Sequence, residues 1–329
     1  MIQEITIENY KSIQSLSIEL GRVTVFIGEN GCGKSNILEA IALGSAAAAD
    51  KLDNEFLASR GIRVTDPKLM RSAFEIENLD KEIKIIFKGI NNKKIFYSLN
   101  HSNDFYSSWL SKDYITSELE TLSQEMEVVS QEIERKNLQN ATLILIKSLH
   151  GNTYKKMKNV EKKLVKVDNL LDIEAKYIWN FFVFCLEFTK LKEFSKEGQI
   201  EPLGIKGEGL FKYLRYLSQP QFKEKLDQVK EKLELIDWFE DFDIPDNLYP
   251  GEKTLKIKDR YLDPDLEYFD QKSANEGFLF LLFYFCLFIG EETPKFFAID
   301  NIDSSLNPRL CRRLIQELVE LAKKYDKQV

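Results

Sequence analysis

A short segment near the amino terminus has the residue types and spacing that bind phosphate groups. Residues 28–35 read G-E-N-G-C-G-K-S, which matches G-x-x-x-x-G-K-[ST] at every fixed position. Glycines let a loop curl until its backbone N–H groups surround an anion, and a helix that begins there adds partial positive charge. We expect Lys34 to reach the β- and γ-phosphates of a nucleotide and Ser35 to bind Mg²⁺. The predicted nucleotide-binding residues are Asn30, Gly31, Cys32, Gly33, Lys34, Ser35 and Asn36.

A second candidate lies near the other end of the sequence, where an apolar run ends in a carboxylate. Residues 296–300 read F-F-A-I-D, which is typical of a buried parallel strand with Asp300 at its carboxyl edge. Ligands bind at that edge in open α/β sheets, so Asp300 is the natural second anchor for Mg²⁺. The alternative is an aspartate that only caps a helix.

The elements that must hold the phosphate loop occur in the required order. Residues 2–7 and 16–20 alternate apolar and polar side chains, as half-buried strands do. Residues 23–27 form a short, mostly apolar run, which predicts a strand buried on both faces directly before the loop. Residues 36–43 have the apolar spacing of a helix.

Further elements follow from similar patterns. Residues 82–87 and 94–99 are predicted to form the two strands of a hairpin. Residues 278–289 form an apolar run that is too short to cross a bilayer, so we predict a buried helix there. Residues 177–191 have aromatic and apolar side chains at helical spacing, which favours core packing. A helix is expected from Pro308 to about Tyr325, because the fixed φ of proline suits a helix start.

Three segments together resemble one family. I-E-N-Y-K-S-I, G-E-N-G-C-G-K-S-N and I-D-N-I-D-S-S-L-N-P-R-L are similar to the RecF/SMC-type branch of ABC ATPases, and most similar to OLD-like, AAA-labelled ATPases of bacterial anti-phage defence. The resemblance covers residues 1–45 and 203–326. It implies an α/β P-loop NTPase fold with a mostly parallel sheet, an antiparallel side sheet and an inserted antiparallel helical arm. It also implies ATP and Mg²⁺ as cofactors.

The resemblance assigns a role to residues 273–277, S-A-N-E-G. Family heads carry a serine–glycine signature at a helix start that reaches the γ-phosphate held by the partner of a dimer. The matching positions here are Ser273, Asn275 and Gly277, although the segment departs from the usual L-S-G-G-Q. The alternative is a capping box between Ser273 and Glu276.

The catalytic positions implied by the resemblance are Asp300, Asn301 and Asp303. Family members usually place a glutamate after the Mg²⁺ aspartate, where it polarises the attacking water. Asn301 stands there instead, and an amide can orient water but cannot accept its proton. Hydrolysis is therefore expected to be slow, or another carboxylate serves as the base, with Asp303 the nearest candidate.

The expected domain organisation has three parts. Residues 1–105 form the amino-terminal lobe, residues 106–195 an inserted arm, and residues 196–329 the carboxy-terminal lobe. Two heptad-like seams predict an antiparallel coiled coil in the arm, although an ordinary helical subdomain remains the alternative. The resemblance implies a further strand and a switch histidine past Val329. We expect a missing carboxy-terminal portion, in which an effector such as a nuclease has room; the alternative is that the γ-phosphate sensor is absent.

The overall composition limits the classes of function. A net charge of −7 and a pI of about 5.3 argue against a dedicated nucleic-acid coat, although the lysine-rich second seam could touch phosphates. Two distant histidines and four cysteines without a C-x-x-C pair are too few for a usual zinc site. Unpaired cysteines and the absence of a signal-like start favour the cytoplasm, with no membrane partner.

The leading functional hypothesis is an ATPase whose heads pair head-to-tail around ATP and control an effector such as a nuclease or toxin in anti-phage defence. One alternative is a nucleotide-gated scaffold that binds ATP but hardly cleaves it, which Asn301 motivates. Another is a RecF-like ATPase of DNA repair, with DNA as a partner; the acidic composition is against it.

Overall fold

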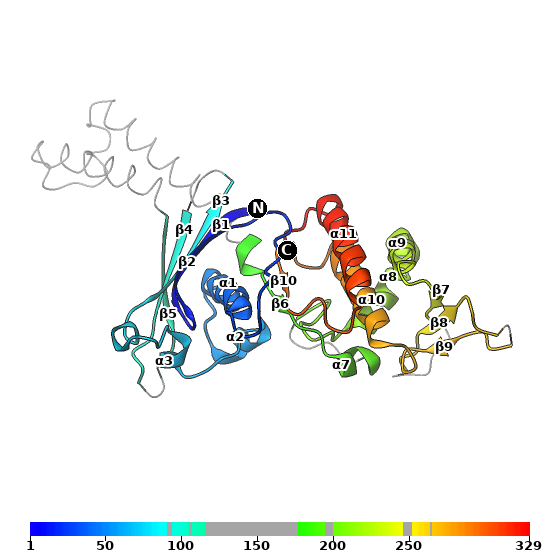
Figure 1. The fold of residues 1–329 in the computed structure, drawn as a ribbon, viewed down its shortest axis with the longest axis horizontal. Coiled ribbons are helices and arrows are strands. Elements are labelled where there is room, and N and C mark those ends of the chain that lie inside the picture. The colour runs from blue at the N-terminus through cyan, green and yellow to red at the C-terminus, as the bar shows by residue number, and fades with distance from the viewer. Residues whose placement is uncertain (91–93, 105–106, 116–176, 195–199, 246–251, 264) are drawn as a thin grey trace, which may run out of the picture.

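Two apolar cores organise the chain into two lobes (Figure 1). The structure is a computed structural model, and it describes residues 1–90, 94–104, 107–115, 177–194, 200–245, 252–263 and 265–329. Among these residues, no helix is both long and apolar enough to cross a membrane. The amino-terminal lobe carries the antiparallel sheet, and the carboxy-terminal lobe is mainly helical.

The amino-terminal lobe is a five-stranded antiparallel sheet with the strand order β2-β1-β3-β4-β5. Its strands are β1 (Ile2–Tyr10), β2 (Ile13–Glu19), β3 (Ile83–Gly89), β4 (Lys94–Asn100) and β5 (Leu110–Ile115). The predicted hairpin is confirmed, because β3 pairs antiparallel with β4. Helix α1 (Lys34–Ala48) packs on this sheet so closely that a Cβ on Gly44 would lie 2.6 Å from the Phe87 ring.

Short helices close the edge of this lobe beside α1. They are α2 (Asn54–Ser59), α3 (Pro67–Met70) and the 3-10 turn η1 (Ile76–Asn78). Asp53 and Asp66 cap α2 and α3 by accepting hydrogen bonds from backbone N–H groups of the first turn. The connection between α2 and α3 contacts α1, because Arg63 donates to Asn36 and Glu39.

The carboxy-terminal lobe is built around helix α10 (Glu276–Ile289). Every residue from Phe278 to Ile289 is buried, which confirms the predicted buried helix. A helix with apolar side chains on every face is stable only when other elements pack around all of it. The other elements of this lobe are α7 (Phe188–Lys192), α8 (Leu210–Leu217), η2 (Pro220–Phe222), α9 (Lys223–Leu233), α11 (Pro308–Lys324) and the antiparallel strands β7 (Phe239–Asp243), β8 (Lys256–Asp259) and β9 (Phe269–Asp270).

Short parallel segments join the two lobes. Strand β10 (Ala298–Ile299) pairs parallel with β6 (Val183–Phe184), and on its other side Phe296 bridges to Gln328 in parallel. Val329 in turn donates to the carbonyl of Arg22 at 2.9 Å and accepts from the amide of Thr24 at 2.8 Å, which is the pattern of a parallel pair. Segments from four distant parts of the sequence therefore lie side by side.

The expected strand over residues 23–27 is wrong. The segment is extended but is not part of a strand, and Val25 and Ile27 are 53% and 91% exposed. Its backbone pairs with Val329 through Arg22 and Thr24, but no strand is assigned to residues 23–27. The mostly parallel sheet is likewise not confirmed, since the larger sheets among the described residues are antiparallel.

The range predicted as an inserted arm includes residues that belong to the lobes. Strand β5 pairs with β4. The expected core packing of residues 177–191 is confirmed, since Ile178, Phe181 and Phe184 are buried in the two cores. Their helical spacing does not produce one helix, because Val183 and Phe184 form β6, which pairs with β10. The coiled-coil seams lie in residues 116–176, outside the described residues, and the arm stays a prediction.

Candidate functional site

The phosphate loop leads directly into helix α1. Gly31 and Gly33 have φ of 85° and 99°, a region that residues with a side chain rarely adopt. Gly33 is the N-cap of α1, no side chain caps the helix, and no acidic residue lies in its first turn. The first-turn N–H groups are therefore left for an anionic ligand, with the helix dipole adding positive potential.

Lys34 folds back over this loop. Its Nζ donates to the carbonyl oxygens of Gly28 at 2.7 Å and Glu29 at 2.8 Å, and lies 3.8 Å from Cys32 Sγ. These contacts hold the ammonium group at the mouth of the loop, where phosphate oxygens would meet it.

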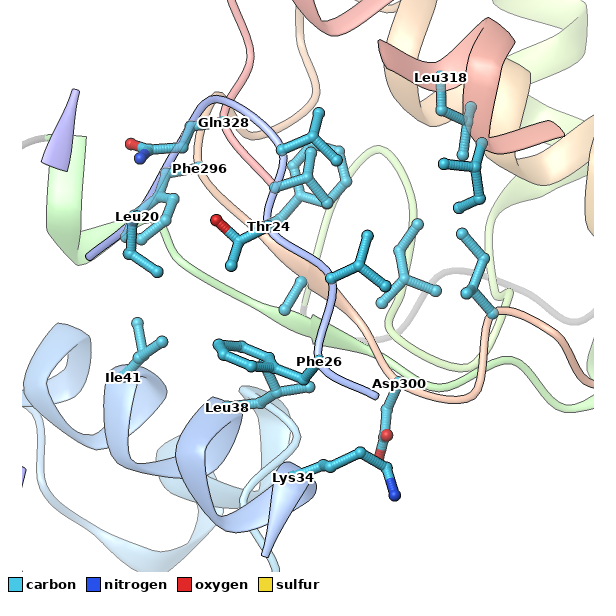
Figure 2. Close-up of a pocket in the computed structure, with 18 of the residues that line it drawn as sticks. Leu20, Thr24, Phe26, Lys34, Leu38, Ile41, Phe296, Asp300, Leu318 and Gln328 are labelled. Carbon is cyan, nitrogen blue, oxygen red and sulfur yellow. The ribbon is translucent and has the colours of Figure 1, made fainter. Parts of the chain in front are cut away.

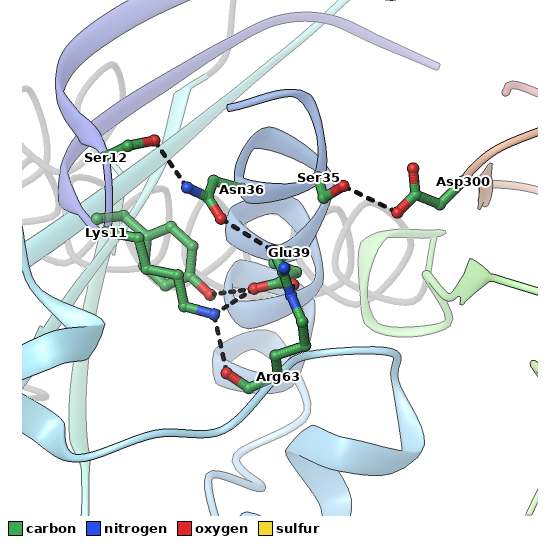
Figure 3. A network of polar contacts seen from close by, with 8 residues as sticks. Lys11, Ser12, Ser35, Asn36, Glu39, Arg63 and Asp300 are labelled. Atoms are coloured by element: carbon green, nitrogen blue, oxygen red, sulfur yellow. Dashed lines mark hydrogen bonds and ion pairs between the residues drawn. The ribbon is translucent and has the colours of Figure 1, made fainter. Parts of the chain in front are cut away.

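Ser35 and Asp300 meet across the boundary between the lobes. Asp300 follows the last residue of β10, and its backbone N–H donates to the carbonyl of Phe184 at 2.8 Å. The Ser35 hydroxyl donates to Asp300 Oδ2 at 2.9 Å (Figure 3). Both side chains offer oxygen ligands, which suit Mg²⁺ bound together with phosphate oxygens and water. Among the described residues there is no cluster of three or more metal-binding His, Cys, Asp or Glu side chains.

A cleft of about 160 Å³ opens at this boundary (Figure 2). Its polar end is lined by Lys34, Asp300, Asn301 and Asp303. Its apolar remainder is lined by side chains of both lobes, among them Phe26, Leu38, Ile41 and Leu318. The structure thus brings the loop lysine and the predicted catalytic residues to one cleft.

Asn301 and Asp303 lie in the exposed turn that follows Asp300. Asn301 has φ of 56°, a left-handed conformation in which asparagine is enriched. The turn is closed by hydrogen bonds from the amide of Ser304 to the carbonyl of Asn301 at 2.9 Å and from the amide of Leu306 to the carbonyl of Asp303 at 3.2 Å.

The segment predicted as a signature precedes α10, and its capping differs from expectation. The N-cap is Asn275, whose side chain accepts from the amide of Phe278 at 2.8 Å, so the capping box of Ser273 and Glu276 is wrong. Ser273 lies two residues too early to cap and instead donates to Asp270 at 3.2 Å. Ser273 and Asn275 are exposed, and neither lines the cleft described around Lys34.

A charged network beside the loop was missed by the sequence reading. Glu39 is buried in α1 and accepts from Tyr10 Oη at 3.3 Å, from Lys11 Nζ and from Arg63 Nε (Figure 3). The hydrogen bond to Glu39 raises the pKa of Arg63, and burial lowers the pKa of Lys11. A glutamate among the apolar positions of the predicted helix was the signal available in the sequence.

This network extends to the first turn of α1. Arg63 donates to Asn36 Oδ1 at 3.1 Å, and Asn36 Nδ2 donates to Ser12 Oγ at 2.7 Å. The β1–β2 turn and the α2–α3 connection are thereby tied to the phosphate loop.

Comparison with known proteins gives a family and a fold. The profile of a family described as AAA domain matches residues 4–244. No curated protein matches the chain. The Smc head domain of Pyrococcus furiosus, solved with an extended coiled coil and bound to the C-terminal domain of ScpA, superposes with a TM-score of 0.50 at 15% identity, covering 100% of this chain and 88% of that one.

The Smc head domain of Pyrococcus yayanosii, solved with a coiled coil and joint, has a TM-score of 0.44 at 13% identity over 100% of this chain and 91% of that one. That value is too low to support an inference. The first likeness concerns the fold alone.

Proposed function

The chain belongs to the AAA-domain family, and from this premise we propose that it binds the phosphates of ATP with Mg²⁺ at the amino terminus of α1, where the two lobes meet, and hydrolyses ATP to ADP and phosphate. The observation that carries the proposal is the hydrogen bond of Ser35 to Asp300 at the amino terminus of α1. Two oxygen ligands suited to Mg²⁺, Lys34 and an uncapped helix terminus thus meet at the start of α1, and phosphoryl transfer uses groups of these kinds.

Each group has a distinct task in this proposal. Backbone N–H groups of residues 31–35 bind the phosphate oxygens, and Lys34 exchanges its loop carbonyl partners for the β- and γ-phosphates. Ser35 and Asp300 would hold Mg²⁺, which neutralises charge on the phosphates when bound. Asn301 or Asp303 orients the attacking water, and only Asp303 can also accept its proton.

The proposal is tested by ATP binding and Mg²⁺-dependent phosphate release with purified protein. Lys34→Ala is expected to lower both, because it removes the charge that meets the phosphates. Lys323→Ala is the matched control, since Lys323 is an exposed lysine in the last turn of α11. Wild-type protein that binds no ATP at millimolar concentration would contradict the proposal.

A second candidate is a nucleotide-gated scaffold that binds ATP but hardly cleaves it. The observation in its favour is Asn301, an exposed amide in the turn after Asp300. Tight ATP binding that depends on Lys34, together with phosphate release no faster than in the Lys34→Ala variant, would favour the scaffold.

We further propose that two heads pair around ATP and that this switch controls an effector, such as a nuclease or toxin, in anti-phage defence. The exposed Ser273, three residues before α10, supports pairing, since its hydroxyl is accessible to the γ-phosphate held by a partner. The defence role rests on the family resemblance of the motifs. Size measurement with a slowly hydrolysed ATP analogue tests pairing: wild type should dimerise and Ser273→Arg should stay monomeric.

A further inference from the structure

The two sides of the α1 amino terminus differ in chemistry. On one side Ser35 contacts Asp300, and on the other Asn36 contacts Ser12 of the β1–β2 turn (Figure 3). If the proposed function holds, the metal and terminal phosphates lie on the Asp300 side. A triphosphate that crosses the helix terminus then points its nucleoside toward the side of Asn36.

A hollow of about 380 Å³ lies on that second side. Its lining includes Lys11, Asn36, Arg63, Thr65, Leu69 and Phe74. Of its positively charged side chains, Arg63 stands at the end nearest the loop, since it donates to Asn36, whereas Arg71, which also lines the hollow, donates to Asn103 and His101.

Apolar side chains also line the hollow. Phe74 is 70% exposed and Leu69 is 59% exposed, although both are large apolar residues. Phe74 also lines a neighbouring hollow whose other walls include Ser12, Cys32 and Gly33 of the turn and the loop. An exposed aromatic ring beside a phosphate loop offers a flat face on which a base can stack.

Arg63 holds an exposed guanidinium in the hollow, next to Asn36. Its side chain is 66% exposed, while its Nε is fixed on buried Glu39 and its terminal nitrogen on Asn36. A guanidinium held in this way keeps an orientation that suits phosphate oxygens.

We propose that the nucleoside of the bound nucleotide occupies the hollow between Arg63 and Phe74, with a purine base stacked on the Phe74 ring. This inference rests on the proposed function and adds the base subsite to it. Every base has a π-face, so stacking alone does not select one base. A purine has the larger ring, so we expect the site to favour purines over pyrimidines.

The test compares binding of ATP with binding of inorganic tripolyphosphate, which has the phosphates but no base. Phe74→Ala should weaken ATP binding about tenfold or more and leave tripolyphosphate binding within about twofold. Phe74→Trp should retain ATP binding, because it keeps an aromatic face. Ile76→Ala is the control, as Ile76 is a large apolar residue, 86% exposed, that lines neither hollow.

The outcomes separate this inference from the proposed function. If wild type binds both ligands and Phe74→Ala weakens neither, or weakens both equally, the base subsite is wrong and the phosphate site stands. If wild type binds neither ligand, the proposed function itself fails. If Phe74→Ala changes only the oligomeric state, Phe74 belongs to a protein contact and the inference is overturned.

Discussion

The Ser35 hydroxyl donates a 2.9 Å hydrogen bond to Oδ2 of Asp300, across 265 positions of sequence. In Asp300→Asn the amide oxygen can still accept this bond, so folding stability should change by less than about 1 kcal/mol. The lost negative charge should lower Mg²⁺-dependent ATP turnover by about 100-fold or more. Phosphate release and urea unfolding measure the two effects.

Asp265→Asn is the control for this substitution, since Asp265 is an exposed carboxylate outside the cleft. Turnover in Asp300→Asn equal to that of the control would remove Asp300 from the metal site.

Asn301 lines the cleft in the turn directly after Asp300. Asn301→Glu should raise turnover above wild type, because the new side chain can accept the proton of the attacking water. It should also lower the free energy of unfolding by about 1 kcal/mol, because glutamate tolerates a φ of 56° less well than asparagine. Single-turnover phosphate release and urea unfolding measure the two effects.

Asn301→Gln separates the two effects, since it matches the length of glutamate without the basic carboxylate. An Asn301→Glu protein no faster than Asn301→Gln would show that position 301 does not limit hydrolysis.

Gln328 joins the two termini of the described fold. Its buried side chain donates to the carbonyls of Ile2 at 2.6 Å and Gly21 at 2.9 Å, and accepts from the amide of Ile2 at 2.9 Å. Gln328→Ala should lower the free energy of unfolding by about 2–4 kcal/mol, because it leaves buried backbone groups without partners. Urea unfolding measures this change.

Gln221→Ala, at an exposed glutamine, should change the free energy of unfolding by less than about 0.5 kcal/mol. Equal stability of the Gln328 and Gln221 variants would contradict the role of Gln328.

Lys327 makes folding stability depend on pH. Burial lowers its pKa to about 7, while its Nζ donates to the carbonyl of Gly290 at 2.9 Å. The unfolded lysine keeps its proton to about pH 10.4, so between pH 7 and 10 the unfolded state binds more protons and stability rises with pH. From pH 7.5 to 9.0 the free energy of unfolding should rise by about 1–2 kcal/mol.

Urea unfolding at both pH values checks this, and Lys327→Met should lose most of the rise because it has no proton to release. The same rise in both proteins would assign the pH dependence to other groups.

Local patterns determined much of this protein directly from sequence. Gly31 and Gly33 predicted a tight loop, because glycine adopts a positive φ more easily than other residues. Pro308 predicted the start of α11. The apolar run 278–289 predicted a buried helix, and alternation predicted β3 and β4. These features depend on backbone geometry and on side-chain periodicity over a few residues, which the sequence contains.

Tertiary packing decided what depends on distant segments. Residues 23–27 are apolar enough for a strand, yet a strand forms only where neighbouring backbones supply partners, and those neighbours come from the far end of the chain. The placement of Asp300 beside Ser35 depends on how two separate cores join. Phe74 gave no signal in the sequence, because only the folded chain sets it beside Arg63 and the phosphate loop.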